Sequence, residues 1–215
     1  MHCCQALYDH TFDTAKANED LQAYYDHGIK NNSRQLYNMI STLPLEGIDA
    51  LDVGGGVGAI TFELFKLGVR SATMVDISVQ YVQLFLEEAK QQGLYNSAQG
   101  IQGDFLQCAN QISPHDLLVM DKVVCCYNNY DSLVSRAGEK ARRWIAYSLP
   151  ADVWWVRWGH WFEQIWNRVK GDHFKTYVHP TAKIEAILLS KGFRLLEKRR
   201  WREWEYALFE RKDAK

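Results

Sequence analysis

The sequence predicts an α/β protein in which one mostly parallel sheet is covered by helices on both faces. From residue 48 onward, short apolar segments alternate with amphipathic helical segments. A glycine-rich turn follows the first apolar segment, and two apolar segments adjoin each other near the end of the chain. Alternating strands and helices favour right-handed crossovers and parallel strands. A length of 215 residues suits one domain with a small appendage.

The elements follow in order along the chain. Residues 14–43 are expected to be helical, with a break near Gly28 and apolar residues such as Tyr24 and Tyr25 on one face. Ser78, just after a strand, is an expected helix cap. Strands are expected at 48–53, 71–76, 98–104, 115–124 and 143–150, and helices at 59–68, 78–93, 130–141 and 180–191.

The last two apolar segments predict an antiparallel hairpin at one edge of the sheet. Residues 193–201 and 203–212 both have strand character and are joined around Arg202 and Glu203. So short a connection cannot support a parallel crossover. The residues of the turn are not those that hairpin turns prefer.

Composition excludes several classes of protein. The chain is 47% hydrophobic and 24% charged with a net charge of −1, so it lacks the basic face that phosphate backbones need, and no nucleic-acid partner is expected. The start of the chain lacks the pattern of a signal peptide, and no apolar run approaches the ~20 residues of a membrane span. Five cysteines with two vicinal pairs do not resemble a secreted disulfide framework, so a cytoplasmic protein is expected.

The turn in "LDVGGGVGAITFEL", residues 51–64, predicts a nucleotide-type ligand. Gly54, Gly56 and Ala59 satisfy the spacing of a dinucleotide-binding turn, and Asp76 ends the next strand, where an acid can bind ribose hydroxyls. Because glycine has no side chain, the backbone of such a turn and the free N–H groups of the following helix can approach a ligand closely. A glycine turn without a ligand is the structural alternative.

Both NAD and S-adenosylmethionine satisfy this pattern, and three features favour the second. Asp52 precedes the first glycine by two residues, where it would face a pyrophosphate unfavourably but suits an ammonium and a sulfonium. Asp104, in "GDF" after the third strand, can accept a hydrogen bond from an adenine amino group. The pattern of elements also predicts one compact sheet with a terminal hairpin, and no second domain for a hydride acceptor is expected.

At these residues the sequence resembles the class I S-adenosylmethionine-dependent methyltransferases, from about residue 45 to the end. The resemblance implies a Rossmann-like seven-stranded sheet of order 3-2-1-4-5-7-6, with strand 7 antiparallel. It also implies an N-terminal helical lid at 1–44, a methyltransferase domain at 45–215 and a Trp-rich helical insertion at about 151–178. "LDVGGGVG", "DKVVCCY", "WWVR" and "YVHP" resemble, more closely, a bacterial group labelled magnesium-protoporphyrin O-methyltransferase-like.

The resemblance also assigns roles to individual residues. Glycines of the turn would line the methionine part of S-adenosylmethionine, acids after the second and third strands would hold the ribose and the adenine, and Asp121 would lie beside the methyl group and substrate. The cofactor-binding residues predicted in this way are Asp52, Gly54, Gly56, Gly58, Asp76, Ile77, Asp104, Phe105 and Asp121.

Two residues are candidates for catalysis. His179 in "YVHP" can act as a base, or it can cap the following helix or pack structurally. Tyr127 would lie near the pocket, where wall packing is the alternative role. Lys122 can neutralise Asp121 or meet an anionic substrate. Cys125 and Cys126 are expected to continue an apolar strand into the core, and without C-x-x-C spacing no metal site is expected.

Residues 152–171 form a segment unusually rich in tryptophan. Trp154, Trp158, Trp161 and Ile165 recur at helical spacing, and His160 is among the residues off that stripe. The stripe can pack on the sheet, line an apolar pocket, or contact a membrane surface or a partner subunit.

The favoured hypothesis is an S-adenosylmethionine-dependent methyltransferase acting on a small, aromatic or hydrophobic acceptor. Two alternatives stay open: a non-catalytic cofactor-binding module with the same fold, and an NAD-dependent reductase. Turnover of the cofactor distinguishes the first alternative from an enzyme, and nicotinamide binding identifies the second.

Overall fold

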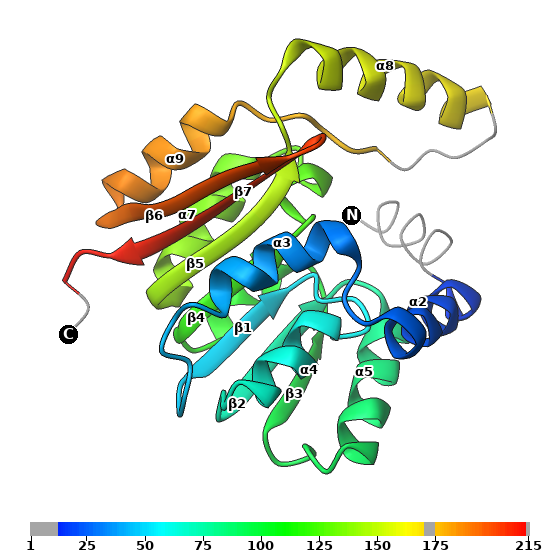
Figure 1. Cartoon of the computed structure of the whole chain (residues 1–215), viewed down its shortest axis with the longest axis vertical. Helices are drawn as coiled ribbons and strands as arrows, with labels where there is room; N and C mark the ends of the chain where they lie inside the picture. Colours follow the sequence, from blue (N-terminus) through cyan, green and yellow to red (C-terminus); the bar gives the residue numbers. More distant parts are fainter. Residues whose placement is uncertain (1–12, 170–174, 214–215) are drawn as a thin grey trace.

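The computed structural model describes residues 13–169 and 175–213, which form a seven-stranded sheet with helices on both faces (Figure 1). The strands are β1 (Asp49–Val53), β2 (Ser71–Asp76), β3 (Ala98–Gln102), β4 (His115–Asp121), β5 (Ala141–Pro150), β6 (Phe193–Trp201) and β7 (Trp204–Arg211). The helices are α2 (Thr14–His27), α3 (Asn31–Ile40), α4 (Ala59–Lys66), α5 (Val79–Gln91), α6 (Phe105–Cys108), α7 (Tyr130–Lys140), α8 (Trp154–Val169) and α9 (Thr181–Ser190), with 3-10 turns η1 (Ala109–Gln111) and η2 (Val124–Cys126).

The strand order is β3-β2-β1-β4-β5-β7-β6, as expected. The strands from β1 to β5 pair in parallel, whereas β7 is antiparallel to both β5 and β6. The hairpin at the edge is therefore confirmed. Arg202, in its two-residue turn, has a φ of 54°, a conformation that such turns require and that glycine or asparagine adopts more readily.

Alternate residues of the central strands supply two separate cores. On β5, Trp144 and Ala146 belong to a core that also holds residues of α3, α4 and α5, while Ile145 and Tyr147 belong to a core on the other face with residues of α7 and α9. This alternation is the two-residue period of a strand, and burial on both faces is why the central strands are mostly apolar.

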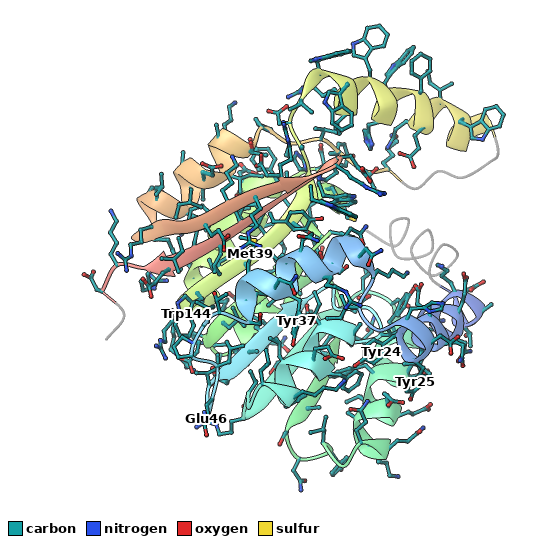
Figure 2. All side chains as sticks on the ribbon, viewed as in Figure 1. Tyr24, Tyr25, Tyr37, Met39, Glu46 and Trp144 are labelled. Carbon is teal, nitrogen blue, oxygen red and sulfur yellow. The ribbon has the colours of Figure 1, made fainter. Side chains whose placement is uncertain are left out.

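The N-terminal helices lie against the first of these faces (Figure 2). The break predicted near Gly28 separates α2 from α3, and Met39 on α3 is fully buried. Two tyrosines hold α2 in place through hydrogen bonds: Tyr24 Oη donates to Glu63 Oε1 at 2.8 Å, and Tyr25 Oη donates to Glu88. These bonds tie α2 to α4 and α5, beside the glycine-rich turn.

The fourth strand ends earlier than the sequence suggested, so the expectation that Cys125 and Cys126 continue it is wrong. β4 stops at Asp121, Lys122 turns the chain with a φ of 60°, and Val124–Cys126 form the 3-10 turn η2. The residues Val123 to Cys125 are buried, as their apolar character indicates. An apolar run predicts burial but does not by itself distinguish a strand from a buried turn.

Candidate functional site

A cavity of about 910 Å³ opens at the carboxyl ends of the parallel strands. The turns after β1, β2, β3 and β4 form one part of its lining, and further residues come from α2, the segment before α3, the start of α3, α5, the segment 175–177 and the start of β7. Ligands of open α/β sheets bind at this edge, where the strand order changes direction. Here that point lies between β1 and β4.

The glycine-rich turn comes close to its neighbours. Gly54 has a φ of 67°, and a Cβ placed there would lie 2.3 Å from Val123 Cγ2. Gly56 has a φ of 57° and lines the cavity, as Gly54 does. Gly58 does not line it: it precedes α4 with a φ of 81°, and an added Cβ would lie 2.3 Å from Phe85. Gly58 therefore serves packing of the turn rather than the cavity surface.

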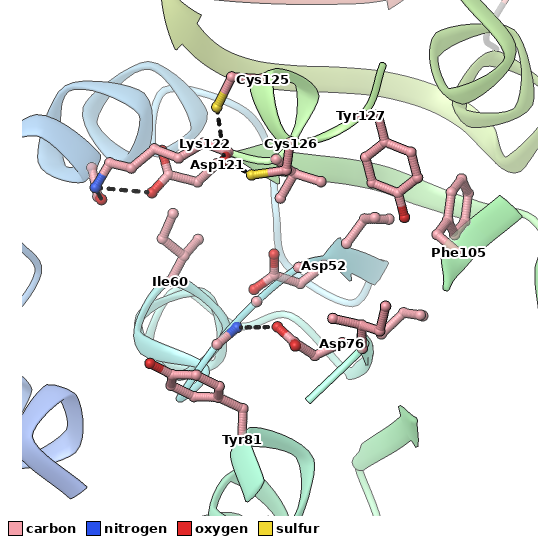
Figure 3. Close-up of a pocket in the computed structure, with 18 of the residues that line it drawn as sticks. Asp52, Ile60, Asp76, Tyr81, Phe105, Asp121, Lys122, Cys125, Cys126 and Tyr127 are labelled. Atoms are coloured by element: carbon pink, nitrogen blue, oxygen red, sulfur yellow. Dashed lines mark hydrogen bonds and ion pairs between the residues drawn. The ribbon is translucent and has the colours of Figure 1, made fainter. Parts of the chain in front are cut away.

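Four carboxylates lie at or just after the ends of four adjacent strands and line the cavity. Asp104 follows β3, Asp76 ends β2, Asp52 lies near the end of β1, and Asp121 ends β4. Figure 3 shows Asp52 and Asp76 at the centre of the site. The predicted neighbours Ile77 and Phe105 also line the cavity. Parallel strands bring these residues together because their carboxyl ends share one edge of the sheet.

Hydrogen bonds fix the orientation of two of these acids. Asp76 accepts hydrogen bonds from the backbone N–H groups of Gly56 at 3.0 Å and Ser78 at 2.9 Å. Asp52 accepts one from Thr61 Oγ1 at 2.7 Å. The carboxylate after β2 is thus tied to the glycine turn itself.

Burial makes the negative charge of these acids costly. Asp52 is only 2% exposed, and burial raises its pKa to about 7, with Asp121 and Asp76 adding to the rise against the hydrogen bond from Thr61. Burial also raises the pKa of Asp76, opposed by its backbone hydrogen bonds. Neither Asp52 nor Asp76 forms an ion pair with any residue that the structure describes. Such a site favours a ligand that brings positive charge.

Tyr127 lines the cavity and faces the acid after β3. Its hydroxyl donates a hydrogen bond to Asp104 Oδ1 at 2.8 Å, and the same oxygen accepts the N–H of Leu106 at the start of α6. In Figure 3, Tyr127 and Phe105 lie on one side of the site and Asp121 and Lys122 on the other. The phenol is therefore held by a carboxylate, away from the end of β4.

His179 does not line the cavity. It is 5% exposed, and its Nε2–H donates to the carbonyl oxygen of Tyr127 at 2.9 Å. Its ring centroid lies 4.5 Å from that of Tyr130 and 5.7 Å from that of Tyr177. Burial lowers the pKa of His179, which favours the neutral ring. This geometry holds two loops of the site together and does not favour the predicted catalytic role.

Lys122 connects the end of β4 with the N-terminal region. Its Nζ donates to Asn32 Oδ1 at 2.9 Å and Ser33 Oγ at 2.7 Å, and it lies 3.8 Å from Asp121 Oδ2 and 5.7 Å from the centre of the Trp204 ring. Burial lowers the pKa of Lys122, opposed by Asp121. The sequence left the role of this lysine open, and the structure places it on the cavity surface.

Several residues of the cavity were not predicted from the sequence. They come from α2, from the segment before α3, from the segment after α8 and from the start of β7: Asp20, Lys30, Lys175, Tyr177 and Trp204. No local motif marks them, because they reach the site only through the packing of distant segments. The tight hairpin before Trp204 is the one sequence signal that would have indicated its position.

Cys125 and Cys126 also line the cavity, and both thiols donate to the carbonyl oxygen of Lys122, at 3.3 and 3.5 Å. Hydrogen bonding between the thiols raises the pKa of Cys125 and lowers that of Cys126. Cys3 and Cys4 lie outside the described residues. Within residues 13–169 and 175–213, no group of three or more His, Cys, Asp or Glu side chains is placed to hold a metal ion.

Comparisons with known proteins support the fold. No protein-family model matches the sequence, and no match was found among the curated proteins. Among solved structures, magnesium protoporphyrin IX methyltransferase from Synechocystis PCC 6803 with bound SAH is similar, with a TM-score of 0.73 and 18% identity over 96% of this chain and 99% of that chain.

Two other similar structures indicate how varied the substrates of this fold are. A putative sarcosine dimethylglycine methyltransferase from Galdieria sulphuraria has a TM-score of 0.64 and 14% identity, over 85% of this chain and 84% of that one. A putative RNA methyltransferase from Pyrococcus horikoshii has a TM-score of 0.60 and 14% identity, over 86% and 84%. The expected exclusion of nucleic acid is therefore not supported. With its strand order and its row of strand-end carboxylates, this chain has the fold of the class I S-adenosylmethionine-dependent methyltransferases.

Proposed function

We propose that the protein is a methyltransferase that uses S-adenosylmethionine and acts on a small acceptor with an aromatic or hydrophobic body. The observation that carries the proposal is the row of four carboxylates beside the glycine-rich turn. The cofactor offers ribose hydroxyls, an adenine amino group, an ammonium and a sulfonium, and each is a donor or a positive charge that a carboxylate can meet.

The residues present fit this cofactor. Backbone N–H groups orient the carboxylate of Asp76, which leaves it able to accept hydroxyl donors as well. The raised pKa of Asp52 indicates a site that lacks positive charge, which an ammonium or sulfonium would supply. A pyrophosphate would instead lie against buried acids, so this electrostatic arrangement disfavours NAD.

When bound, the cofactor supplies an electrophilic methyl group, and the chain's own residues have to orient the acceptor and exclude water. The lining of the cavity also includes two aromatic residues, Tyr177 and Trp204, and two lysines, Lys30 and Lys175. Rings favour an apolar or aromatic body, and lysines favour an anionic group on it.

We further propose that Tyr127 and His179 act as positioning residues. Tyr127 donates to Asp104, and His179 donates to the Tyr127 carbonyl, so together they fix the wall next to Phe105. No histidine lines the described part of the cavity. An acceptor that is already anionic, such as a carboxylate or thiolate, needs no strong base, which agrees with this lining.

Thermal unfolding with S-adenosylhomocysteine and, in parallel, with NADH tests cofactor choice. A ligand at about a hundred times its Kd adds about 2.7 kcal/mol to the free energy of unfolding. We expect stabilisation by S-adenosylhomocysteine only, and its loss in Asp76→Asn but not in Asp26→Asn, which changes an exposed acid on α2. Stabilisation by NADH alone would identify a reductase instead.

Turnover separates an enzyme from a non-catalytic binding module. Formation of S-adenosylhomocysteine is measured with a panel of small aromatic and hydrophobic acids, amines and thiols. Magnesium protoporphyrin IX belongs in the panel because a similar structure is named for it. We expect turnover with at least one anionic acceptor. Binding of the cofactor without turnover of any acceptor would favour the binding module.

A further inference from the structure

Helix α8 presents an aromatic stripe to solvent. The exposed fractions of its aromatic side chains run from 44% for Trp155 to 74% for Trp154. At 3.6 residues per turn the stripe occupies about 140° of the helix circumference. Its members are Trp154, Trp155, Trp158, Trp161, Phe162, Ile165 and Trp166.

The exposure of the stripe argues against two of the interpretations that the sequence left open, packing on the sheet and lining a pocket. The stripe does not pack on the sheet, because α8 stands beyond the edge of the other elements and its outer side chains extend away from them (Figures 1 and 2). None of its residues lines the main cavity. Six aromatic side chains, each offering roughly 150–250 Å² at full exposure, form a patch of roughly 700 Å². The largest apolar patch of a typical monomer is about 300–600 Å².

The opposite face of α8 contacts the rest of the protein. Val156 is 7% exposed, and the Nε2 groups of His160 and Gln164 donate to the carbonyl oxygen of Thr176 at 2.8 and 3.0 Å. These contacts fix the rotation of the helix, so the aromatic stripe faces outward. Thr176 also lines the main cavity, which makes α8 a neighbour of the cavity wall.

Exposed cations lie near α8 although the whole chain has a net charge of −1 and α8 itself carries the exposed Glu163. The turn of the β6–β7 hairpin lies next to the start of α8, because the N–H of Ala151 donates to the carbonyl oxygen of Glu203 at 2.8 Å (Figure 1). Arg200 and Arg202 near this turn are exposed, as is Lys175 in the segment that α8 contacts. None of these three cations forms an ion pair with a described residue.

We propose that α8 docks the protein on the surface of an anionic lipid bilayer, with its axis in the plane of the interface. Tryptophan favours the boundary between lipid headgroups and chains, and nearby Lys and Arg side chains favour anionic headgroups. In the described part of the chain, no helix is long and apolar enough to cross a membrane. Docking would place the lipid on one face of α8 and Thr176 of the cavity wall on the other.

Vesicle sedimentation with the full chain tests the aromatic part of the proposal. Vesicles of phosphatidylcholine alone are compared with vesicles holding about 30% phosphatidylglycerol, an anionic lipid. We expect binding to the anionic vesicles and a blue shift of tryptophan emission. The double variant Trp158→Ser/Trp161→Ser should bind at least roughly tenfold more weakly. The control is Tyr95→Ser, which removes an exposed ring, 72% exposed, from the loop between α5 and β3, away from α8.

The double variant Arg200→Gln/Arg202→Asn tests the charge. Asparagine tolerates the positive φ of position 202, so the turn is retained. We expect a loss of roughly tenfold or more on anionic vesicles and no change on neutral ones.

Failure of the wild-type chain to bind either vesicle overturns the proposal, as does binding that the tryptophan variant leaves unchanged. A dimer in light scattering that Trp158→Ser/Trp161→Ser dissociates, without vesicle binding, would assign the stripe to a second copy of the chain. Stabilisation by S-adenosylhomocysteine should be unaltered in these variants, so failure of docking and failure of the proposed function are distinguishable.

Discussion

The cavity and helix α8 both hold residues in environments that are unusual for their type, and the two environments are opposite. The cavity buries carboxylates, of which Asp52 is 2% exposed, whereas α8 exposes aromatic rings, of which Trp154 is 74% exposed. Both arrangements cost free energy in an isolated chain, since buried charge and exposed apolar surface each favour a different surrounding. Under the two proposals a ligand would relieve each cost: a cation in the cavity and an apolar surface at α8. Residues placed against their own solvation preference are therefore the basis of both proposals.

The largest expected effect is on the free energy of unfolding, which should fall when a buried tryptophan is replaced but not when an exposed one is. Trp144 on β5 is 2% exposed and lies in the first core, whereas Trp158 on α8 is 60% exposed (Figure 2 labels Trp144). Trp144→Ala should lower the free energy of unfolding by about 3–5 kcal/mol, because it leaves a large cavity. The matched change Trp158→Ala should alter it by no more than about 0.5 kcal/mol. Urea unfolding measures both, and equal losses would show that α8 packs on the protein in solution.

A smaller loss is expected at the glycine-rich turn. Gly54→Ala would place a Cβ 2.3 Å from Val123 at a φ of 67°, so strain and a clash should together cost about 2–3 kcal/mol. Gly47→Ala is the matched control, because its φ is 75° and no atom lies within 4 Å of an added Cβ. That variant should lose only about 1 kcal/mol. Equal losses in urea unfolding would mean that Val123 moves aside and that the turn is not tightly packed.

Asp52→Asn should stabilise the protein without ligand. The folded chain holds the proton of Asp52 up to about pH 7, whereas the unfolded chain releases it near pH 4. The stability contributed by this proton is fully present below about pH 4 and is lost as the pH rises through about 7. The variant should therefore match wild type at low pH and exceed it at pH 8 by on the order of 4 kcal/mol.

The measurement is the free energy of unfolding of both proteins from pH 4 to 8, with and without S-adenosylmethionine. Under the proposed function, the variant should lose part of the stabilisation that the positively charged ligand gives wild type, since a neutral amide attracts a cation less strongly. If the variant is less stable than wild type at pH 8, or is stabilised by the ligand as much as wild type is, Asp52 is not a buried charge that a bound cation stabilises.

Local sequence predicted the fold and the row of acids because both follow from strands. Strand periodicity indicates the parallel sheet, and Asp76 and Asp121 end strands whose carboxyl ends must meet. The roles of His179 and Lys122 did not follow, because their partners lie far along the chain: His179 bonds to Tyr127 and Lys122 to Asn32. The stripe on α8 was evident in the sequence, but an amphipathic pattern does not say what the apolar face contacts.

The smallest effect expected is at the hairpin turn beside α8, where stability and docking should change in opposite directions. Arg202 has a φ of 54°, which a non-glycine residue adopts at a cost, and its guanidinium lies 4.6 Å from the centre of the Trp201 ring. Arg202→Gly relieves the backbone strain and removes one cation, so we expect a gain of about 0.5 kcal/mol in the free energy of unfolding. We also expect anionic vesicles to be bound roughly fivefold more weakly.

Urea unfolding and vesicle sedimentation on the same preparation give the two values. Arg199→Gly is the control because Arg199 is exposed on β6, next to the turn, but pairs with Glu197. A less stable Arg202→Gly would mean that the contact with Trp201 outweighs the strain, and that arginine occupies this position for the hairpin alone. Opposite signs would instead mean that the turn retains a strained residue whose charge serves the neighbouring aromatic stripe. The backbone strain at Arg202 would then be a third local cost in free energy that a binding partner offsets, in addition to the buried carboxylates and the exposed rings.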